Sequence, residues 1–286
     1  MRSQLNKPKT LILGSSGLIG NTISKYLAKM GSNLVLGISN KTKSTNIDFL
    51  KTISNIIIFD ALDAYKINHN LDYIKPDIII NCVGVTKHVL INYDLKDVYF
   101  LNSIFPNLLS NWCAKNQKHL IHISSDCIFD GKAPGSRIID QEAYGYSKYL
   151  GERNIDHGFI IRTSTVGREL NSQFGLLDWF LNQDTVINGF TNAFFNGVTT
   201  LTLSKYIYKI LEKIPNKKTI LNLTSERISK FDILHIINSI YECNKTILPF
   251  DKPVIDRSLF SYKSERLCFI KKKWRDQILE TKHFEQ

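Results

Sequence analysis

The feature that most constrains the fold is an alternation of short apolar runs with helical patterns across residues 1–165. Continuous Val- and Ile-rich runs are typical of strands buried on both faces, and helices between them imply a parallel sheet covered on each side. The helical patterns include Leu18–Lys29 and Asp94–Lys115. We therefore expect a doubly wound α/β domain over residues 1–165. Its expected strands are Thr10–Leu13, Asn33–Ile38, Asn55–Phe59, Asp77–Asn81, Lys118–Ser124 and Gly158–Arg162.

Residues 166–286 carry shorter and more mixed patterns. They predict a helix near Ser204–Lys213, a strand near Thr219–Leu223 and a helix near Ser229–Tyr241. No internal repeat or low-complexity linker divides the chain, so a flexible tether is not expected. We expect this part to pack on the first mainly as a smaller α/β cap, with some segments returning to the first sheet.

Composition narrows the class of protein. With 43% apolar and 22% charged residues, the 286-residue chain is typical of soluble globular proteins. No apolar stretch approaches the ~20 residues that cross a bilayer, and no signal peptide is recognised, so a cytoplasmic protein is the default expectation. The five cysteines are scattered without a CxxC pair, which argues against a disulfide framework and a metal site.

The net charge of +11 raises the question of an anionic partner. Apart from Lys271–Arg275, the basic residues are spread out, and no aromatic–basic RNA signature accompanies them. A pocket for anionic small molecules explains a basic balance equally well. We expect no nucleic-acid or membrane partner, and a homodimer is the assembly considered.

A glycine-rich turn follows the first expected strand. Gly14, Gly17 and Gly20 are spaced G-x-x-G-x-x-G, and a helical pattern begins within the turn. Glycines allow a tight turn and close approach to a pyrophosphate, while the helix start supplies free N–H groups. A Rossmann-type dinucleotide site is therefore predicted, against the alternative of a tight turn only. The loop residues assigned to the cofactor are Gly14, Ser16, Gly17, Leu18, Ile19 and Gly20.

The end of the second strand indicates which dinucleotide binds. Sites that prefer NAD usually place a carboxylate there to hold the ribose 2′-hydroxyl. Here Asn40 and Lys41 lie in the stretch GISNKTKS, which contains no acid. Lysines attract a 2′-phosphate, so NADPH is favoured over NADH, unless these lysines only form a solvated loop. Asp60, with Ala61 beside it, is the expected partner of the adenine.

Tyr144 and Lys148 stand four residues apart on one face of a predicted helix. An ammonium beside a phenol lowers the pKa of the phenol toward neutral pH, which suits proton transfer. Tyr241 and Lys245 repeat the spacing, but only the first pair follows the fifth strand. Ser125 is expected to bond a substrate carbonyl and the tyrosine, and Asn102 to support the lysine through a water.

The motifs GSSGLIG, NCVG (Asn81–Gly84), SSDCIFDG, YGYSKYLGE and IIRTS (Ile160–Ser164), in this order, resemble an extended short-chain dehydrogenase/reductase. The dTDP-4-dehydrorhamnose reductases and related nucleotide-sugar 4-ketoreductases are the nearest group. The resemblance covers the first domain closely, and the segment Gly189–Thr200 resembles that group's cap. It implies reduction, with NADPH, of the C4 ketone of a nucleotide-linked 4-keto-6-deoxyhexose or N-acetylhexosamine in activated L-deoxysugar (rhamnose-type) and polysaccharide biosynthesis. UDP-linked substrates are favoured over dTDP-linked ones.

The resemblance also implies roles for individual residues. Tyr144 would protonate the developing alkoxide, Lys148 would lower its pKa and bind the nicotinamide ribose, and Ser125 would orient the ketone. The diphosphate would meet the guanidinium fork of Arg257. The further residues implied for the cofactor are Cys82, Val83, Gly84, Asn102, Arg162 and Ser164. Those implied for the substrate are Thr86, Lys87, Ser125, Asp126, Cys127, Trp179, Asn196, Thr199 and Arg257.

Cys127 departs from the dTDP-4-dehydrorhamnose reductase pattern, which has tyrosine two residues after the catalytic Ser/Thr. It resembles GDP-fucose synthase and other epimerase/reductases, in which a cysteine there is an acid or base. A thiolate could remove a proton beside the ketone, giving C3 epimerisation, with Lys87 or His88 as the opposite acid. The alternative is a packing or substrate-shaping cysteine. A second function kept open is a non-catalytic NADP-binding subunit that regulates a partner enzyme.

Overall fold

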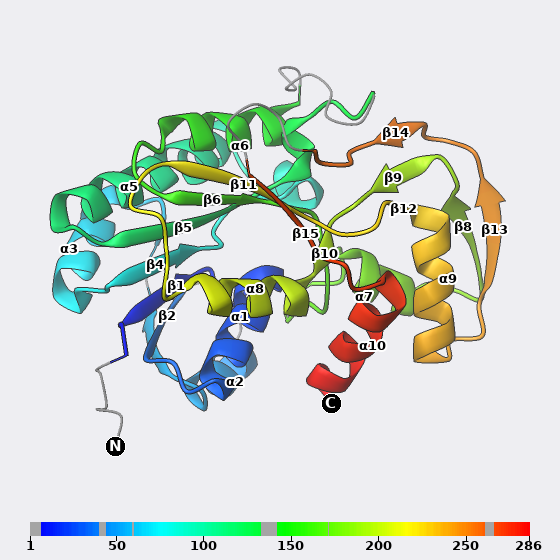
Figure 1. The fold of residues 1–286 in the computed structure, drawn as a ribbon, viewed down its shortest axis with the longest axis horizontal. Helices are drawn as coiled ribbons and strands as arrows, with labels where there is room; N and C mark the ends of the chain where they lie inside the picture. The colour runs from blue at the N-terminus through cyan, green and yellow to red at the C-terminus, as the bar shows by residue number, and fades with distance from the viewer. Residues whose placement is uncertain (1–6, 40–43, 59, 133–141, 171, 261–265) are drawn as a thin grey trace.

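A single parallel sheet of eight strands organises the molecule (Figure 1). The structure, a computed structural model, describes residues 7–39, 44–58, 60–132, 142–170, 172–260 and 266–286. The strand order is β15-β11-β6-β5-β4-β1-β2-β3, and every neighbouring pair is parallel. The order reverses beside β1, which is where ligands bind in open sheets of this kind. The predicted Rossmann-type doubly wound fold is confirmed.

The six predicted strands of the first domain all form. They lie within one or two residues of their expected bounds, although Phe59 falls outside the described residues. Two strands from the second part extend the same sheet: β11 (Thr219–Thr224) and β15 (Arg266–Phe269). The others are β1 (Thr10–Leu13), β2 (Leu34–Ile38), β3 (Asn55–Ile58), β4 (Ile78–Asn81), β5 (His119–Ser124) and β6 (Phe159–Arg162).

Helices cover both faces because each strand is apolar on both sides. One layer holds α1 (Leu18–Lys29), α2 (Ser44–Lys51) and α8 (Thr200–Ile210). The opposite layer holds α3 (Ala64–Ile74), α5 (Phe105–Asn116) and α6 (Ala143–Asn154). The helix expected near Ser204–Lys213 forms as α8, with its start at Thr200 and its end at Ile210. Thr199 caps it, and it packs on α1 as part of the sheet layer.

The predicted helix 94–115 is a continuous helical stretch with a π turn in its middle. It runs from α4 (Leu95–Tyr99) through the π turn η2 (Phe100–Ile104) into α5. A π turn leaves one residue extra within the helix and is frequent at functional sites. Here it contains Asn102, which is fully buried and faces α6. Short 3₁₀ turns follow β4 and β5: η1 (Lys87–Asn92) and η3 (Asp126–Ile128).

The second part forms a smaller lobe with its own apolar core, to the right of the sheet in Figure 1. Trp274 and Phe195 pack together in this core. Within the described parts of the chain, no helix is both long and apolar enough to span a membrane. The lobe contains β7 (Thr165–Val166), α7 (Leu176–Leu181), β8 (Val186–Phe190), β9 (Ala193–Phe195), β10 (Val198–Thr199), β12 (Ile228–Ser229), α9 (Lys230–Tyr241), β13 (Thr246–Phe250), β14 (Ile255–Asp256) and α10 (Trp274–Glu285).

Candidate active site

The glycine turn after β1 has the geometry of a phosphate-binding loop. Gly14 has a φ of +78°, which favours glycine, and its carbonyl accepts the N–H of Gly17 at 3.0 Å. A Cβ on Gly20 would lie 2.2 Å from the Gly14 carbonyl oxygen, so only glycine lets α1 approach the loop. Gly17 caps α1 without any side-chain bond, which leaves the first amides of the helix for an anion. These features fit the diphosphate of a dinucleotide.

A hollow with about 360 Å³ of empty space connects this loop to the predicted catalytic side chains. Ile19 of α1 forms one wall, and the ends of β4 and β5 form others. It brings together seven of the residues predicted from sequence and adds Val85, Ile123 and Ser124. The seven are Ile19, Cys82, Val83, Gly84, Thr86, Tyr144 and Lys148.

Tyr144 lines this hollow, and Ser125 contacts it from the turn after β5. The Ser125 side chain accepts the Cys127 N–H at 3.0 Å and donates to Asp126 Oδ1 at 3.1 Å, which fixes the turn after β5. The Tyr144 hydroxyl is hydrogen-bonded to Ser125, but burial outweighs this bond and raises the pKa of Tyr144 above its ordinary value. Lys148 is not among the groups that act on the pKa of Tyr144, so the lowering of this pKa by its ammonium stays a prediction. Tyr144 is therefore a neutral phenol at neutral pH, the form that donates a proton.

Lys148 is buried and donates to the Ile123 carbonyl at 2.9 Å. Burial lowers the pKa of this ammonium to about 8, while the carboxylate of Glu152 acts in the opposite direction. The side chain is thus held at the carboxyl end of β5 by a backbone carbonyl. With a pKa of about 8, the ammonium is mostly protonated at pH 7 and loses its proton about one pH unit higher.

Asn102 supports this arrangement differently from the prediction. Its side-chain amide accepts the Val85 N–H at 2.9 Å and donates to the Val85 carbonyl at 3.0 Å. It also donates to Ser147 Oγ at 3.0 Å. Because Ser147 directly precedes Lys148, Asn102 joins the loop after β4 to α6 through direct bonds, and the predicted water-mediated support is not needed to explain its position.

Arg162 and Ser164 were predicted to meet the nicotinamide. Instead, the guanidinium of Arg162 forms a buried ion pair with Glu152, with Nη2 and Oε2 2.7 Å apart. That side chain points into the protein because β6 is an inner strand with helices on both faces. The Ser164 hydroxyl is buried, and no partner for it is found within the described residues.

The adenine side of the site is described only in part. Asp60 is exposed and accepts the N–H of Leu62 at 3.0 Å, so its carboxylate shapes the turn that contains Ala61. Ser16 lies in the glycine turn as expected. Asn40 and Lys41, on which the predicted cofactor preference depends, lie outside the described residues.

Two predicted substrate residues of the cap have structural roles in this fold. The Asn196 amide accepts the Leu259 N–H at 2.8 Å and donates to the Leu259 carbonyl at 2.9 Å. Thr199 is fully buried and its hydroxyl caps α8. Both polar groups join segments of the fold, and their predicted contact with the substrate stays a prediction. Trp179 is partly buried against the core of the lobe.

Arg257 fits a substrate role better. Its Nε is buried without a hydrogen-bond partner within the described chain. The side chain packs on Gly131, where a Cβ would lie 3.0 Å from Arg257 Cγ. Its charge acts on both Cys127 and Tyr144. A cation with a free donor therefore faces the catalytic turn from the cap.

Lys230 is a functional candidate that the sequence reasoning missed. It is the first residue of α9, its Nζ lies 4.1 Å from the centre of the Phe195 ring, and burial lowers its pKa. Asp126, Cys127 and Arg257 all act on its charge. One signal was present in the sequence: a lysine directly after the capping Ser229 opposes the helix dipole.

Lys87 and His88, the predicted opposite-face acids, are both exposed. Lys87 Nζ pairs with Glu142 Oε2 at 3.0 Å, and the His88 ring stacks on Phe174 with centroids 6.4 Å apart. Neither side chain has the burial that characterises Cys127 and Lys230.

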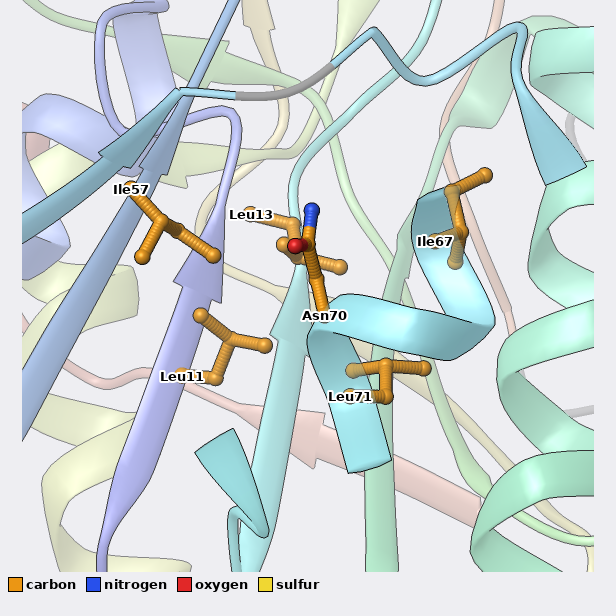
Figure 2. Close-up of a pocket in the computed structure, with 6 residues that line it drawn as sticks. All are labelled: Leu11, Leu13, Ile57, Ile67, Asn70 and Leu71. Atoms are coloured by element: carbon orange, nitrogen blue, oxygen red, sulfur yellow. The ribbon is translucent and has the colours of Figure 1, made fainter. Parts of the chain in front are cut away.

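A second hollow, with about 190 Å³ of empty space, lies between β1, β3 and α3. Figure 2 shows its lining, in which Asn70 is the one polar side chain among five aliphatic ones. Its lining contains no group of reactive side chains. The lining residues are Leu11, Leu13, Ile57, Ile67, Asn70 and Leu71.

The parallel sheet, the glycine turn after β1 and the meeting of Ser125, Tyr144 and Lys148 define an extended short-chain dehydrogenase/reductase. The profile described as RmlD substrate binding domain matches residues 8–246. The chain therefore belongs to the RmlD family, as its motifs predicted.

Individual proteins resemble parts of the chain. The dTDP-4-dehydrorhamnose reductase of Aggregatibacter actinomycetemcomitans is 26% identical over 176 residues, 58% of this chain and 54% of that protein. Methionine adenosyltransferase 2 subunit beta of Xenopus tropicalis is 28% identical over 153 residues, which are 52% of this chain and 43% of that protein. The chain thus aligns with about half the length of these curated relatives. The structure of dTDP-4-dehydrorhamnose reductase from Bacillus anthracis in complex with NADP has the same fold, with a TM-score of 0.75, 17% identity and coverage of 98% of this chain and 100% of that one.

Proposed function

We propose that the protein reduces the C4 ketone of a nucleotide-linked 4-keto-6-deoxyhexose or N-acetylhexosamine, with NADPH as the reductant. The observation that carries the proposal is the neutral phenol of Tyr144, hydrogen-bonded to Ser125 beside the glycine turn and Lys148. Bound NADPH supplies the hydride. Gly14, Gly17 and Gly20 would hold its diphosphate, and the lysine-containing stretch after β2 supports the preference for its 2′-phosphate.

The side chains of the site orient the ketone and transfer the proton. Ser125 Oγ orients the ketone oxygen, and Tyr144 gives its phenolic proton to that oxygen as negative charge develops there. The Lys148 ammonium stabilises the resulting phenolate and holds the cofactor ribose. Because the phenol starts protonated, proton donation needs no prior rearrangement.

Activity on a panel of nucleotide sugars tests this function. Purified protein is given NADPH and UDP- or dTDP-linked 4-keto-6-deoxysugars, and NADPH oxidation is followed with NMR of the products. Turnover with at least one sugar nucleotide, and faster turnover with UDP-linked than dTDP-linked substrates, is expected. Absence of turnover with every member, despite NADPH binding, would contradict the proposal.

Lys230 and Arg257 are proposed to bind the sugar-linked phosphate from the cap side. Both are partly buried cations, and Asp126 is the carboxylate that acts on the charge of Lys230, so two cations with one carboxylate leave the group with a net positive charge. Lys230→Met is expected to raise KM for the nucleotide sugar by about tenfold or more, because a charged hydrogen bond contributes about 1.5–3 kcal/mol. Steady-state kinetics measure this effect. The exposed Lys66→Met on α3 is the control and should leave KM nearly unchanged; an equal effect of both would refute the assignment.

Cys127 is proposed to take part in C3 epimerisation, but in a different form from the predicted thiolate. Burial raises the pKa of its thiol to about 12, so Cys127 is protonated at neutral pH and suited to donate a proton. In this scheme a base on the opposite face removes the C3 proton, and the thiol returns a proton on its own face. Cys127→Ser is expected to leave NADPH oxidation within about threefold for a ketone that needs no epimerisation, and to abolish the C3-inverted product. NMR of the product measures the second effect. Unchanged formation of the inverted product would reduce Cys127 to a packing role.

A second candidate function is regulation of a partner enzyme by an NADP-binding subunit. The similarity to methionine adenosyltransferase 2 subunit beta favours it. The Ser125, Tyr144 and Lys148 set argues for catalysis, since a regulator has no need of all three. Affinity purification of a stoichiometric enzyme partner, with no ketoreductase activity of the chain alone, would reverse the order of the two candidates.

A further inference from the structure

A buried ion pair lies directly behind the candidate active site. Arg162 Nε is 3.0 Å from both carboxylate oxygens of Glu152, and Nη2 is 2.7 Å from Oε2. The two side chains are 5% and 2% exposed. The cost of removing both charges from water offsets most of their attraction, so a buried pair is weak as a stabilising device. A role beyond stability therefore has to be considered.

The pair connects α6, which carries Tyr144 and Lys148, to the end of β6, the strand beside β5. Glu152 follows Lys148 by one helical turn on α6, which places both on one face of the helix. Arg162 ends β6 and is in register with Ser124 of β5, the residue before Ser125. On the same helix, Gly151 packs so closely on the π turn η2 that a Cβ would lie 2.1 Å from the Asn102 carbonyl oxygen. The ion pair thus joins α6 to the end of β6, and the close approach joins it to η2.

Glu152 is also the carboxylate whose charge raises the pKa of Lys148. Two other titratable groups on the surrounding elements interact electrostatically with the Lys148 ammonium, namely Cys82 and His122. Burial raises the pKa of Cys82 to about 12 and holds the pKa of His122 well below its ordinary value, so both are neutral at neutral pH. Glu152 also acts on the more exposed Lys218. Among the described residues that influence Lys148, Glu152 is therefore the one that carries negative charge.

We propose that Glu152, oriented by Arg162, is a positioning residue that keeps Lys148 charged and in place at the cofactor hollow. The role rests on the proposed reductase function, in which Lys148 acts on Tyr144. The pair touches neither the cofactor hollow nor Tyr144 directly and works through Lys148. Its effect is to keep Lys148 protonated, because burial alone would lower the pKa of the ammonium further.

The direct test is the titration of Lys148 in the cofactor-free protein. The ¹³Cε resonance of labelled lysine is followed with pH and assigned by its loss in Lys148→Arg. In the unaltered protein the midpoint is expected near pH 8. Glu152→Gln is expected to lower it by at least about one pH unit, because an adjacent opposite charge favours the ammonium by that order. The alkaline limb of kcat/KM should move down by the same amount.

Two further variants keep the test decisive. Glu152→Gln leaves a buried guanidinium without its partner, so the double variant Glu152→Met/Arg162→Met is measured beside it. It removes both charges and restores apolar packing, and the lowered midpoint should persist. Glu152→Asp retains the carboxylate and should restore at least half of the difference in midpoint. A folded double variant whose Lys148 titrates as in the unaltered protein would overturn the proposal.

The same measurements separate this proposal from the proposed function. If no nucleotide sugar is reduced but the Lys148 midpoint moves as expected, the reductase assignment fails while the electrostatic role of Glu152 stands. If reduction is observed and neither the midpoint nor the alkaline limb moves in Glu152→Gln and the double variant, the pair is only a packing element.

Discussion

Tyr144→Phe is expected to lower kcat for ketone reduction by about 10²–10⁴-fold, the range contributed by general acid catalysis. The substitution removes only the hydroxyl that hydrogen-bonds to Ser125 and leaves the ring in its buried place. Because the phenol is the proton donor of the proposed reaction, KM and NADPH affinity should change far less than kcat. Steady-state kinetics and a fluorescence titration with NADPH measure these quantities.

Tyr241→Phe is the matched control for this variant. Tyr241 repeats the four-residue spacing to a lysine, and burial raises its pKa too, but it is the last residue of α9 in the second lobe. Its removal should leave kcat unchanged within about twofold. Full activity of Tyr144→Phe would exclude the tyrosine as proton donor, while equal losses in both variants would indicate general damage to the fold.

Gly20→Ala is the second change with a large expected effect. The added Cβ would lie 2.2 Å from the Gly14 carbonyl oxygen and 2.7 Å from its carbonyl carbon, so α1 or the glycine turn has to move. Overpacking costs about 1–3 kcal/mol, and a clash with backbone belongs at the upper end. We expect a loss of that size in the free energy of unfolding and at least about a tenfold weaker NADPH affinity. Denaturant unfolding and fluorescence titration measure the two effects.

Gly17→Ala provides the comparison within the same turn. A Cβ on Gly17 would lie 3.4 Å from the Gly14 carbonyl oxygen, an ordinary contact, and its backbone is extended. Its free energy of unfolding should therefore stay within about 0.5 kcal/mol of the unaltered protein. Equal stability of Gly20→Ala and Gly17→Ala would contradict the close approach of α1 to β1.

The first domain was predictable because its strands are apolar on both faces and separated by clear helical patterns. Less of the second part could be predicted. The run at Thr219–Leu223 indicated a strand, but partner choice in a parallel sheet is a long-range property that no local pattern encodes. The π turn at Asn102 was also missed, because a single extra residue in a helix leaves no compositional signal.

The site residues of the first domain could likewise be predicted better than those of the second part. Ser125, Tyr144 and Lys148 were brought together as expected because each sits at a fixed place relative to a strand or helix start. The structural hydrogen bonds of Asn196 and Thr199 were not predicted, because amides and hydroxyls can satisfy backbone groups as well as a substrate, and sequence does not distinguish the two uses. Lys230 was missed because its proximity to Asp126 depends on how the lobe meets the sheet.

Transfer of hydride to the sugar is the central claim, and isotopic labelling tests it most directly. The protein is incubated with NADPH deuterated at C4 of the nicotinamide and a UDP-linked 4-keto-6-deoxysugar, and the product is examined by NMR. Deuterium from one face of the nicotinamide should appear at C4 of the sugar, and Tyr144→Phe should suppress its appearance. A protein that binds NADPH and the sugar nucleotide but leaves C4 unlabelled would contradict the account.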